Sequence, residues 1–175
     1  MMKLNSLNDV FEEQLGDLYD AEQQLVQALP KVAGAASSGE LREALEHHLE
    51  QTRDHVRRLD EIFTTVGMTR PTEHCEAMEG LLKEGEKVIA ATGDPSAKDA
   101  ALIAAAQRVE HYEIAGYGTA RTLADELGFH DAKDLLDETL DEESDADKLL
   151  TKIATGGMFK TGINERATET TTSPR

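Results

Sequence analysis

The segment from Ala105 to Leu127 constrains the fold most, because it places a charged residue inside an otherwise apolar helical stripe. Small and apolar residues recur there in steps of three and four, which is typical of a helix with one buried face. Glu113 falls on that face, and Glu110 lies one turn earlier at its border. Two neighbouring carboxylates in a helical core repel each other unless a proton or a cation compensates them. The segment therefore predicts a long helix whose inward acidic pair needs compensation.

Length and composition favour a single all-α domain. A chain of 175 residues is long enough to bury one sizeable core. It is rich in Ala, Leu, Glu and Asp, contains only 4 prolines and no Trp, and lacks sustained period-two alternation. The single cysteine, Cys75, excludes an intramolecular disulfide framework.

The charge and hydropathy patterns exclude several classes of partner. A formal net charge of −17 without a basic stripe argues against nucleic-acid binding. No apolar run approaches the roughly 18 residues that a membrane-spanning helix needs. The first residues lack the apolar block of a signal peptide. We therefore expect a cytoplasmic protein with neither a nucleic-acid nor a membrane partner.

Start and stop signals divide the chain into four long helices and one short helix. Ser37 and Glu40 have the spacing of a capping box, Pro30 is expected to kink or interrupt the preceding helix, and Gly67 is expected to cap the second. Asp94 and Pro95 form an N-terminal cap signal. The expected bundle spans residues 1–156, and residues 157–175 are expected to form a flexible tail. The expected helices span about 6–30, 37–66, 72–91, 95–127 and 131–154.

Two helical hairpins joined by a crossover segment indicate a four-helix bundle with one long connection and a short extra helix within it. Positions equally far from a hairpin turn lie at the same height, and by this count polar residues on all four inner faces meet at mid-bundle. In the last helix the predicted inner line contains Leu135, Thr139, Glu142, Ala146, Leu149 and Ile153. The candidate metal ligands are Glu22, His48, His55, Glu110, Glu113, Glu142 and Asp145.

Carboxylates with one or two imidazoles suit iron or manganese and, less plainly, zinc. Two cations bridged by Glu113 or Glu22 would use these ligands economically. A bland interpretation stays open, because a single Glu on a helical stripe usually lies at the core edge. In that case the acids pair with His48, His55 and Arg53 or share protons, and the bundle is a structural or interaction module.

Four phrases of the chain are distinctive: Asp17-Leu-Tyr-Asp-Ala-Glu-Gln-Gln-Leu25, His48-Leu-Glu-Gln-Thr-Arg-Asp-His55, Glu110-His-Tyr-Glu-Ile-Ala115 and Glu138-Thr-Leu-Asp-Glu-Glu143. With these phrases, the chain resembles the YciF/YciE family of bacterial ferritin-like proteins over roughly residues 5–155. This resemblance implies a ferritin-like bundle that is dimeric and associated with stress responses, and it implies no settled activity.

A wider resemblance to rubrerythrins implies a di-iron centre and ferroxidase- or peroxidase-like chemistry with oxygen or peroxide as the small oxidant. Storage of iron in a hollow shell is a less favoured alternative, because the sequence shows no legible signal for shell assembly. The chain departs from the rubrerythrin pattern at Thr52, where a Glu is expected, and at Asp145, where a His is expected. The pattern places ligands at Glu22, His55, Glu110, Glu113 and Glu142.

Overall fold

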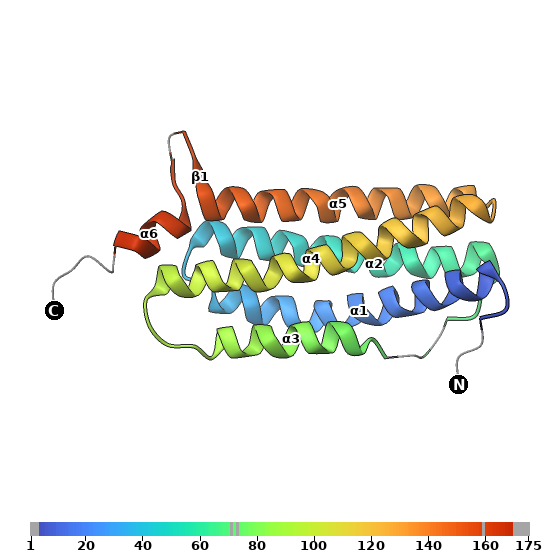
Figure 1. The fold of residues 1–175 in the computed structure, drawn as a ribbon, viewed down its shortest axis with the longest axis horizontal. Helices are drawn as coiled ribbons and strands as arrows, with labels where there is room; N and C mark the ends of the chain where they lie inside the picture. The colour runs from blue at the N-terminus through green and yellow to red at the C-terminus, as the bar shows by residue number, and fades with distance from the viewer. Residues whose placement is uncertain (1–3, 71, 73, 159, 170–175) are drawn as a thin grey trace.

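The computed structural model describes residues 4–70, 72, 74–158 and 160–169, and it confirms the all-α prediction. Four long helices and a shorter crossover helix form an elongated bundle (Figure 1). The helices are α1 (Leu7–Ala35), α2 (Gly39–Val66), α3 (Glu76–Ile89), α4 (Pro95–Glu126), α5 (His130–Thr155) and α6 (Ile163–Glu169).

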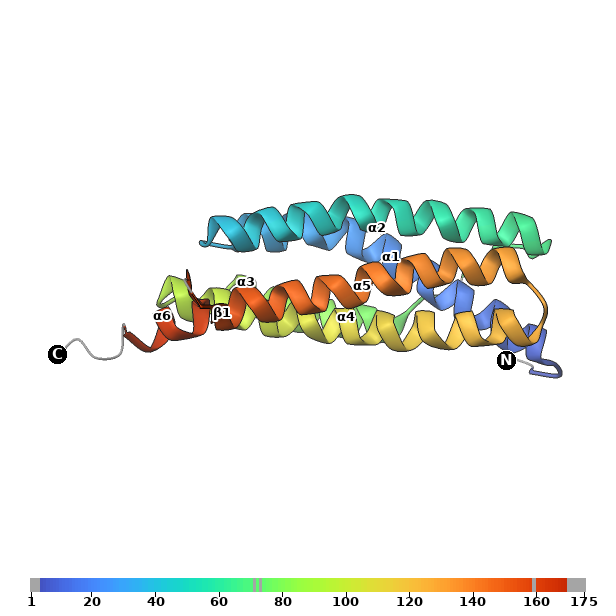
Figure 2. The ribbon, with the colours of Figure 1, turned by 90° about the horizontal axis from the view of Figure 1, so that it is seen from above.

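The long helices form two antiparallel hairpins, α1 with α2 and α4 with α5, which pack side by side (Figures 1 and 2). The connection from α2 to α4 returns along the whole bundle, and α3 lies within it against α1 and α4. Buried apolar side chains form two separate clusters. One contains Leu25, Leu45 and Leu102, and the other contains Phe11 and Leu59.

Most of the predicted helix termini are confirmed. The Ser6 side chain accepts a hydrogen bond from the amide of Asp9, whose carboxylate accepts the Ser6 amide in return. Asp94 caps α4 by accepting the Ala97 amide. Gly67 follows α2 with φ of 71°, a left-handed conformation that glycine adopts without steric cost.

At the first hairpin turn, the predicted interruption of the helix at Pro30 and the predicted capping box of Ser37 and Glu40 were wrong, whereas a kink at Pro30 stays a prediction. The α1 helix continues past Pro30 to Ala35, because Leu29 and Ala33 on either side stay packed in the core. The side chain of the N-cap residue of α2, Ser38, makes no capping hydrogen bond. The carboxylate of Asp99 on α4 instead accepts the Ser37 and Ser38 amides at 2.8 and 2.7 Å, so the cap comes from another helix.

The inner face of α5 is rotated by one residue from the prediction. Two stripes of equal periodicity run along this helix, one with Leu135, Glu142 and Leu149 and the other one residue later. Leu136, Glu143 and Leu150 of the second stripe are buried, and Thr139 and Ile153 of the predicted line are buried as well. Leu136 is fully buried, whereas Leu149 keeps 39% of its surface exposed. Glu143, and not Glu142, therefore faces the centre of the bundle.

The segment after α5 has more structure than the expected irregular tail. Strands β1 (Gly156–Gly157) and β2 (Lys160–Thr161) pair as a short antiparallel ribbon, and α6 follows. Ile163 at the start of α6 is buried in the apolar cluster that contains Leu25. An ion pair joins Lys160 to Glu40 on α2. The predicted tail also included residues 170–175, which lie outside the described residues.

Candidate metal centre

All four long helices contribute acidic or imidazole side chains to the middle of the bundle, between the two apolar clusters. None of these six side chains belongs to a residue with more than 5% of its surface exposed. They are Glu22 from α1, His48 and His55 from α2, Glu110 and Glu113 from α4, and Glu143 from α5.

The six side chains form two groups that share one carboxylate, and in each group the potential ligand atoms lie within 4.8 Å of one another. Glu143 belongs to both groups, so it would contribute to holding metal in either of them. The first group is His48, Glu110, Glu113 and Glu143, and the second is Glu22, His55 and Glu143.

The two imidazoles approach the carboxylates from opposite ends of this pair of groups. His48 Nε2 lies 3.4 Å from an oxygen of Glu110 and 3.5 Å from Oε2 of Glu143. His55 Nδ1 lies 2.9 Å from Oε1 of Glu143 and 3.2 Å from Oε1 of Glu22. Each histidine therefore faces a different oxygen of the shared carboxylate.

Close approach without hydrogen bonding distinguishes this cluster from an ordinary buried polar network. His55 Nδ1, both oxygens of Glu113 and both oxygens of Glu143 lack a hydrogen-bond partner among the described residues, as do Glu22 Oε2 and Glu110 Oε2. Buried polar atoms are nearly always paired, and unpaired ones are costly. Converging buried carboxylates that two histidines compensate only in part suit coordination of a common cation.

A hydrogen bond on the far side of His55 fixes which of its nitrogens faces the cluster. His55 Nε2 lies 2.8 Å from Oε2 of Glu142, and Arg58 donates to both oxygens of that carboxylate at 2.7 and 3.1 Å. The Nε2 proton is thereby held outside the cluster, so Nδ1 can present its lone pair to a metal. Ligating histidines commonly carry such a carboxylate partner.

Two further polar residues border the cluster. Tyr117 is fully buried, and its hydroxyl donates to Oε1 of Glu22 at 2.5 Å. Thr52 is buried one turn from His55, but its hydroxyl donates to the backbone carbonyl of His48 at 2.9 Å. The Thr52 hydroxyl therefore hydrogen-bonds within its own helix. The second group lacks the additional carboxylate that the rubrerythrin pattern has at this position.

In the metal-free cluster, some carboxyl groups have raised pKa values, and the carboxyl group of Glu143, which contacts both histidines, has a lowered pKa. Burial, reinforced by the neighbouring carboxylates, raises the pKa of Glu110 and Glu113 well above the usual range. Burial also raises the pKa of Glu143, but contact with His55 and the charge of His48 outweigh it, so this pKa is lowered overall. Burial lowers the pKa of His55, yet Glu143 and Glu22 raise it to about 10. In the metal-free protein, bound protons therefore reduce the repulsion between the buried carboxylates.

The structure brings together five of the seven predicted ligands, and it separates two from the cluster. Glu142 lies outside it and supports His55. Asp145 is directed to the surface, where its side chain is 77% exposed and pairs with Lys148. The physical reason is the one-residue rotation of α5, which turns both residues outward and brings Glu143 in. The Leu136, Glu143 and Leu150 stripe was the sequence signal for this ligand.

Two cavities meet at the cluster, and His48 and Glu110 line both of them. The larger, about 380 Å³, extends between α1, α2, α3 and α4 and is lined mainly by apolar side chains. The smaller, about 230 Å³, lies between α2, α4 and α5, where His47, Gln51 and Asp145 give it a polar rim. The cluster is therefore reachable from two sides of contrasting polarity.

A four-helix bundle with one long crossover and carboxylate and histidine side chains at mid-height defines a ferritin-like protein. The chain belongs to the DUF892 family, described as a domain of unknown function, whose family model matches residues 6–167. No helix in the described part of the chain is long and apolar enough to cross a membrane.

Relatives support this assignment in sequence and in fold. Protein YciF of Escherichia coli K12 is 44% identical over 165 residues, which cover 94% of this chain and 99% of the relative. The crystal structure of the E. coli stress protein YciF has a TM-score of 0.83 at 46% identity, over 85% of this chain and 94% of that one. YcfI of Rhodopseudomonas palustris, provisionally described as a structural protein, has a TM-score of 0.83 at 39% identity, over 87% and 97% of the two chains.

Proposed function

We propose that the mid-bundle cluster binds two transition-metal ions and that the loaded protein reacts with oxygen or peroxide in stress defence. The observation that carries this proposal is the set of converging, fully buried carboxylate and imidazole atoms that lack hydrogen-bond partners among the described residues. A role in stress defence is supported by the similarity to YciF, which is described as a stress protein of E. coli. The ligand set favours iron or manganese over zinc, because it is dominated by carboxylates.

The protein residues have separate roles in this proposal. Glu143, which belongs to both ligand groups, would hold the metal together with His48 in one group and His55 in the other. Arg58 and Glu142 orient His55, while Tyr117 holds Glu22 by donating to its carboxylate. Bound iron supplies one-electron redox chemistry that no side chain here provides. Apolar clusters flank the site on both sides along the bundle.

Anaerobic loading with Fe(II), followed by exposure to oxygen, tests the proposal directly. We expect uptake of two ions per chain and the optical bands of an oxo-bridged di-ferric centre after oxidation. A matched sample with Glu113→Gln loses the negative charge and one of two unpaired buried carboxylate oxygens from the first group, and it should take up less iron. Protein that remains metal-free after loading and dialysis would count against the proposal.

A second candidate function is a structural or interaction module without metal. The pairing of His55 with Glu22 and Glu143 favours it, because this pairing compensates part of the buried charge. The provisional description of YcfI as a structural protein points the same way. Thermal unfolding with added Fe(II) or Mn(II), compared with added chelator, separates the two functions, since a bound metal stabilises the state that binds it. Identical melting temperatures would favour the structural module.

The oligomeric state belongs to the same proposal. The family resemblance implies a dimer, and light scattering coupled to size-exclusion chromatography measures it. We expect a mass near 38 kDa, twice the chain mass of 19.1 kDa. A large shell would instead support iron storage, and a single-chain mass would remove the dimer from the proposal.

A further inference from the structure

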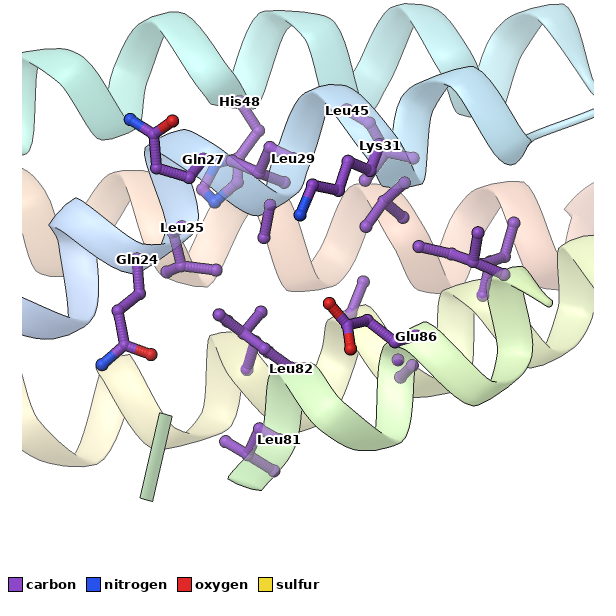
Figure 3. A pocket seen from close by; sticks show the side chains of 18 of the residues that line it. Gln24, Leu25, Gln27, Leu29, Lys31, Leu45, His48, Leu81, Leu82 and Glu86 are labelled. Atoms are coloured by element: carbon purple, nitrogen blue, oxygen red, sulfur yellow. The ribbon is translucent and has the colours of Figure 1, made fainter. Parts of the chain in front are cut away.

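The larger cavity has the form of a binding site for an elongated apolar molecule. Its volume of about 380 Å³ falls in the range of small-molecule pockets, about 300–1,000 Å³. Its walls on α4 run from Leu102 to Glu110, eight residues that correspond to about 12 Å along the bundle. Figure 3 shows His48 on α2 and Leu82 on α3 on opposite sides of this space.

The lining combines apolar and polar side chains. Leucines and other apolar residues from four helices form most of the wall. His48 and Glu110 of the metal cluster also line the cavity, as do Lys31, Glu86 and three glutamines of α1. Figure 3 shows the Lys31 amine and the Glu86 carboxylate on the same side of His48. A molecule in the cavity therefore meets mostly hydrocarbon and, beside the metal cluster, two polar side chains.

Small residues at several lining positions leave the space open. Ala28, Ala105 and Ala106 line it, and so does Gly85. A Cβ atom added at Gly85 would meet no heavy atom within 4 Å, so the helix could carry a larger side chain there without a clash. Leucine or methionine at these positions would fill the space that the present residues leave empty.

We propose that this cavity binds the alkyl chain of an amphipathic molecule whose uncharged hydroxyl or hydroperoxide head lies beside His48 and Glu110. Glu110 is 2% exposed, and its Oε2 is an acceptor without a hydrogen-bond partner among the described residues. An O–H group satisfies that acceptor. A carboxylate head would suffer repulsion from the buried acids and from a chain of net charge −17.

Medium-chain alkyl hydroperoxides would be the oxidant of the proposed function. This assignment rests on the proposed function, whereas binding of the alkyl chain does not. Reduction of such a molecule breaks the O–O bond, consumes two protons and two electrons, and yields the alcohol and water. An iron-loaded cluster would supply these two electrons through oxidation of ferrous to ferric iron. Hydrogen peroxide has no chain to bury and gains nothing from the cavity.

Binding of 1-decanol to the metal-free protein tests the chain site without any redox chemistry. Calorimetry should detect one molecule per chain. Ala106→Phe places a ring in the cavity, and Gly85→Leu fills it from α3; each should weaken binding about tenfold or more, equivalent to losing the burial of two methylenes. Ala104→Phe is the matched control, because Ala104 lies on the exposed face of the same helix, and it should bind decanol as the wild type does.

Kinetics with two oxidants test the position of the head. In Fe(II)-loaded protein, Ala106→Phe should slow oxidation by decyl hydroperoxide about tenfold and leave oxidation by hydrogen peroxide unchanged. Equal slowing with both oxidants would overturn the placement of the head at the metal cluster. Absence of decanol binding, or equal binding by Ala106→Phe and Ala104→Phe, would overturn the chain site. Decanol binding by a protein that takes up no metal would overturn the proposed function and leave the chain site standing.

Discussion

At the scale of single residues, the shared carboxylate of Glu143 is the most informative side chain. Both of its oxygens are buried without a hydrogen-bond partner among the described residues, and it belongs to both candidate ligand groups. Glu143→Gln should therefore lower the stoichiometry of Co(II) or Fe(II) in a titration from two ions to one or fewer per chain. Asp145→Asn is the matched control, because its side chain is 77% exposed, and it should leave the stoichiometry unchanged. Loss of metal in Asp145→Asn would contradict the assignment.

A second prediction concerns the side chains that contact His55 from outside the cluster. Arg58 and Glu142 hold the Nε2 side of the ring and leave Nδ1 facing the acids. Glu142→Gln keeps the shape of the side chain but removes its charge, so metal affinity should fall about 10- to 100-fold. Competition with a chromophoric chelator measures this change. Glu138→Gln is the control, because Glu138 contacts Arg58 but not His55; an equal loss of affinity there would attribute the effect to surface charge.

At the scale of helices, the start of α2 depends on a carboxylate from another hairpin. Asp99 is 3% exposed and accepts the Ser37 and Ser38 amides. Asp99→Ala should lower the free energy of unfolding by about 2–4 kcal/mol, because it leaves two amides without their charged acceptor. Ser38→Ala should change it by less than about 0.5 kcal/mol, since that side chain makes no capping hydrogen bond. Urea unfolding of both variants measures this difference, and an effect of Ser38→Ala as large as that of Asp99→Ala would contradict the cap from α4.

The approach of α1 to α4 gives a further prediction at this scale. A Cβ atom at Gly116 would lie 2.8 Å from Cδ2 of Leu18, which is 1% exposed and has little room to move. At Gly118 it would meet nothing within 4 Å. Gly118→Ala should stabilise the protein by about 0.5–1 kcal/mol, and Gly116→Ala should be less stable than Gly118→Ala by at least about 1 kcal/mol. Equal stabilities in urea unfolding would show that the two helices do not pack closely at Gly116.

Helical periodicity was sufficient for the four-helix plan, but it could not choose between adjacent stripes on α5. Leu135 with Glu142 and Leu136 with Glu143 satisfy the same spacing, and only packing against the other helices decides which pair is buried. The buried positions of Glu22 on α1 and of Glu110 and Glu113 on α4 were predicted correctly, because the apolar neighbours of these acids lie on a single stripe of each helix. The cap from Asp99 could not be foreseen either, because it joins residues that are distant in sequence.

At the scale of the whole molecule, the bundle places a polar layer between two apolar clusters. The clusters hold the helices together on both sides, so the layer can keep unpaired acids that would destabilise an isolated helix pair. The crossover also brings α3 alongside α1 and α4, which encloses the larger cavity. The segment between α2 and α4 therefore both connects the two hairpins and forms one wall of the cavity that reaches His48 and Glu110.

The central claim is that the mid-bundle acids and imidazoles are metal ligands. Elemental analysis of protein purified without an affinity metal, with Glu143→Gln prepared in parallel, tests it most directly. The account predicts up to two equivalents of iron or manganese per chain in the wild type and one or fewer in the variant. Wild-type protein without transition metal, which also stays metal-free after anaerobic loading, would contradict it.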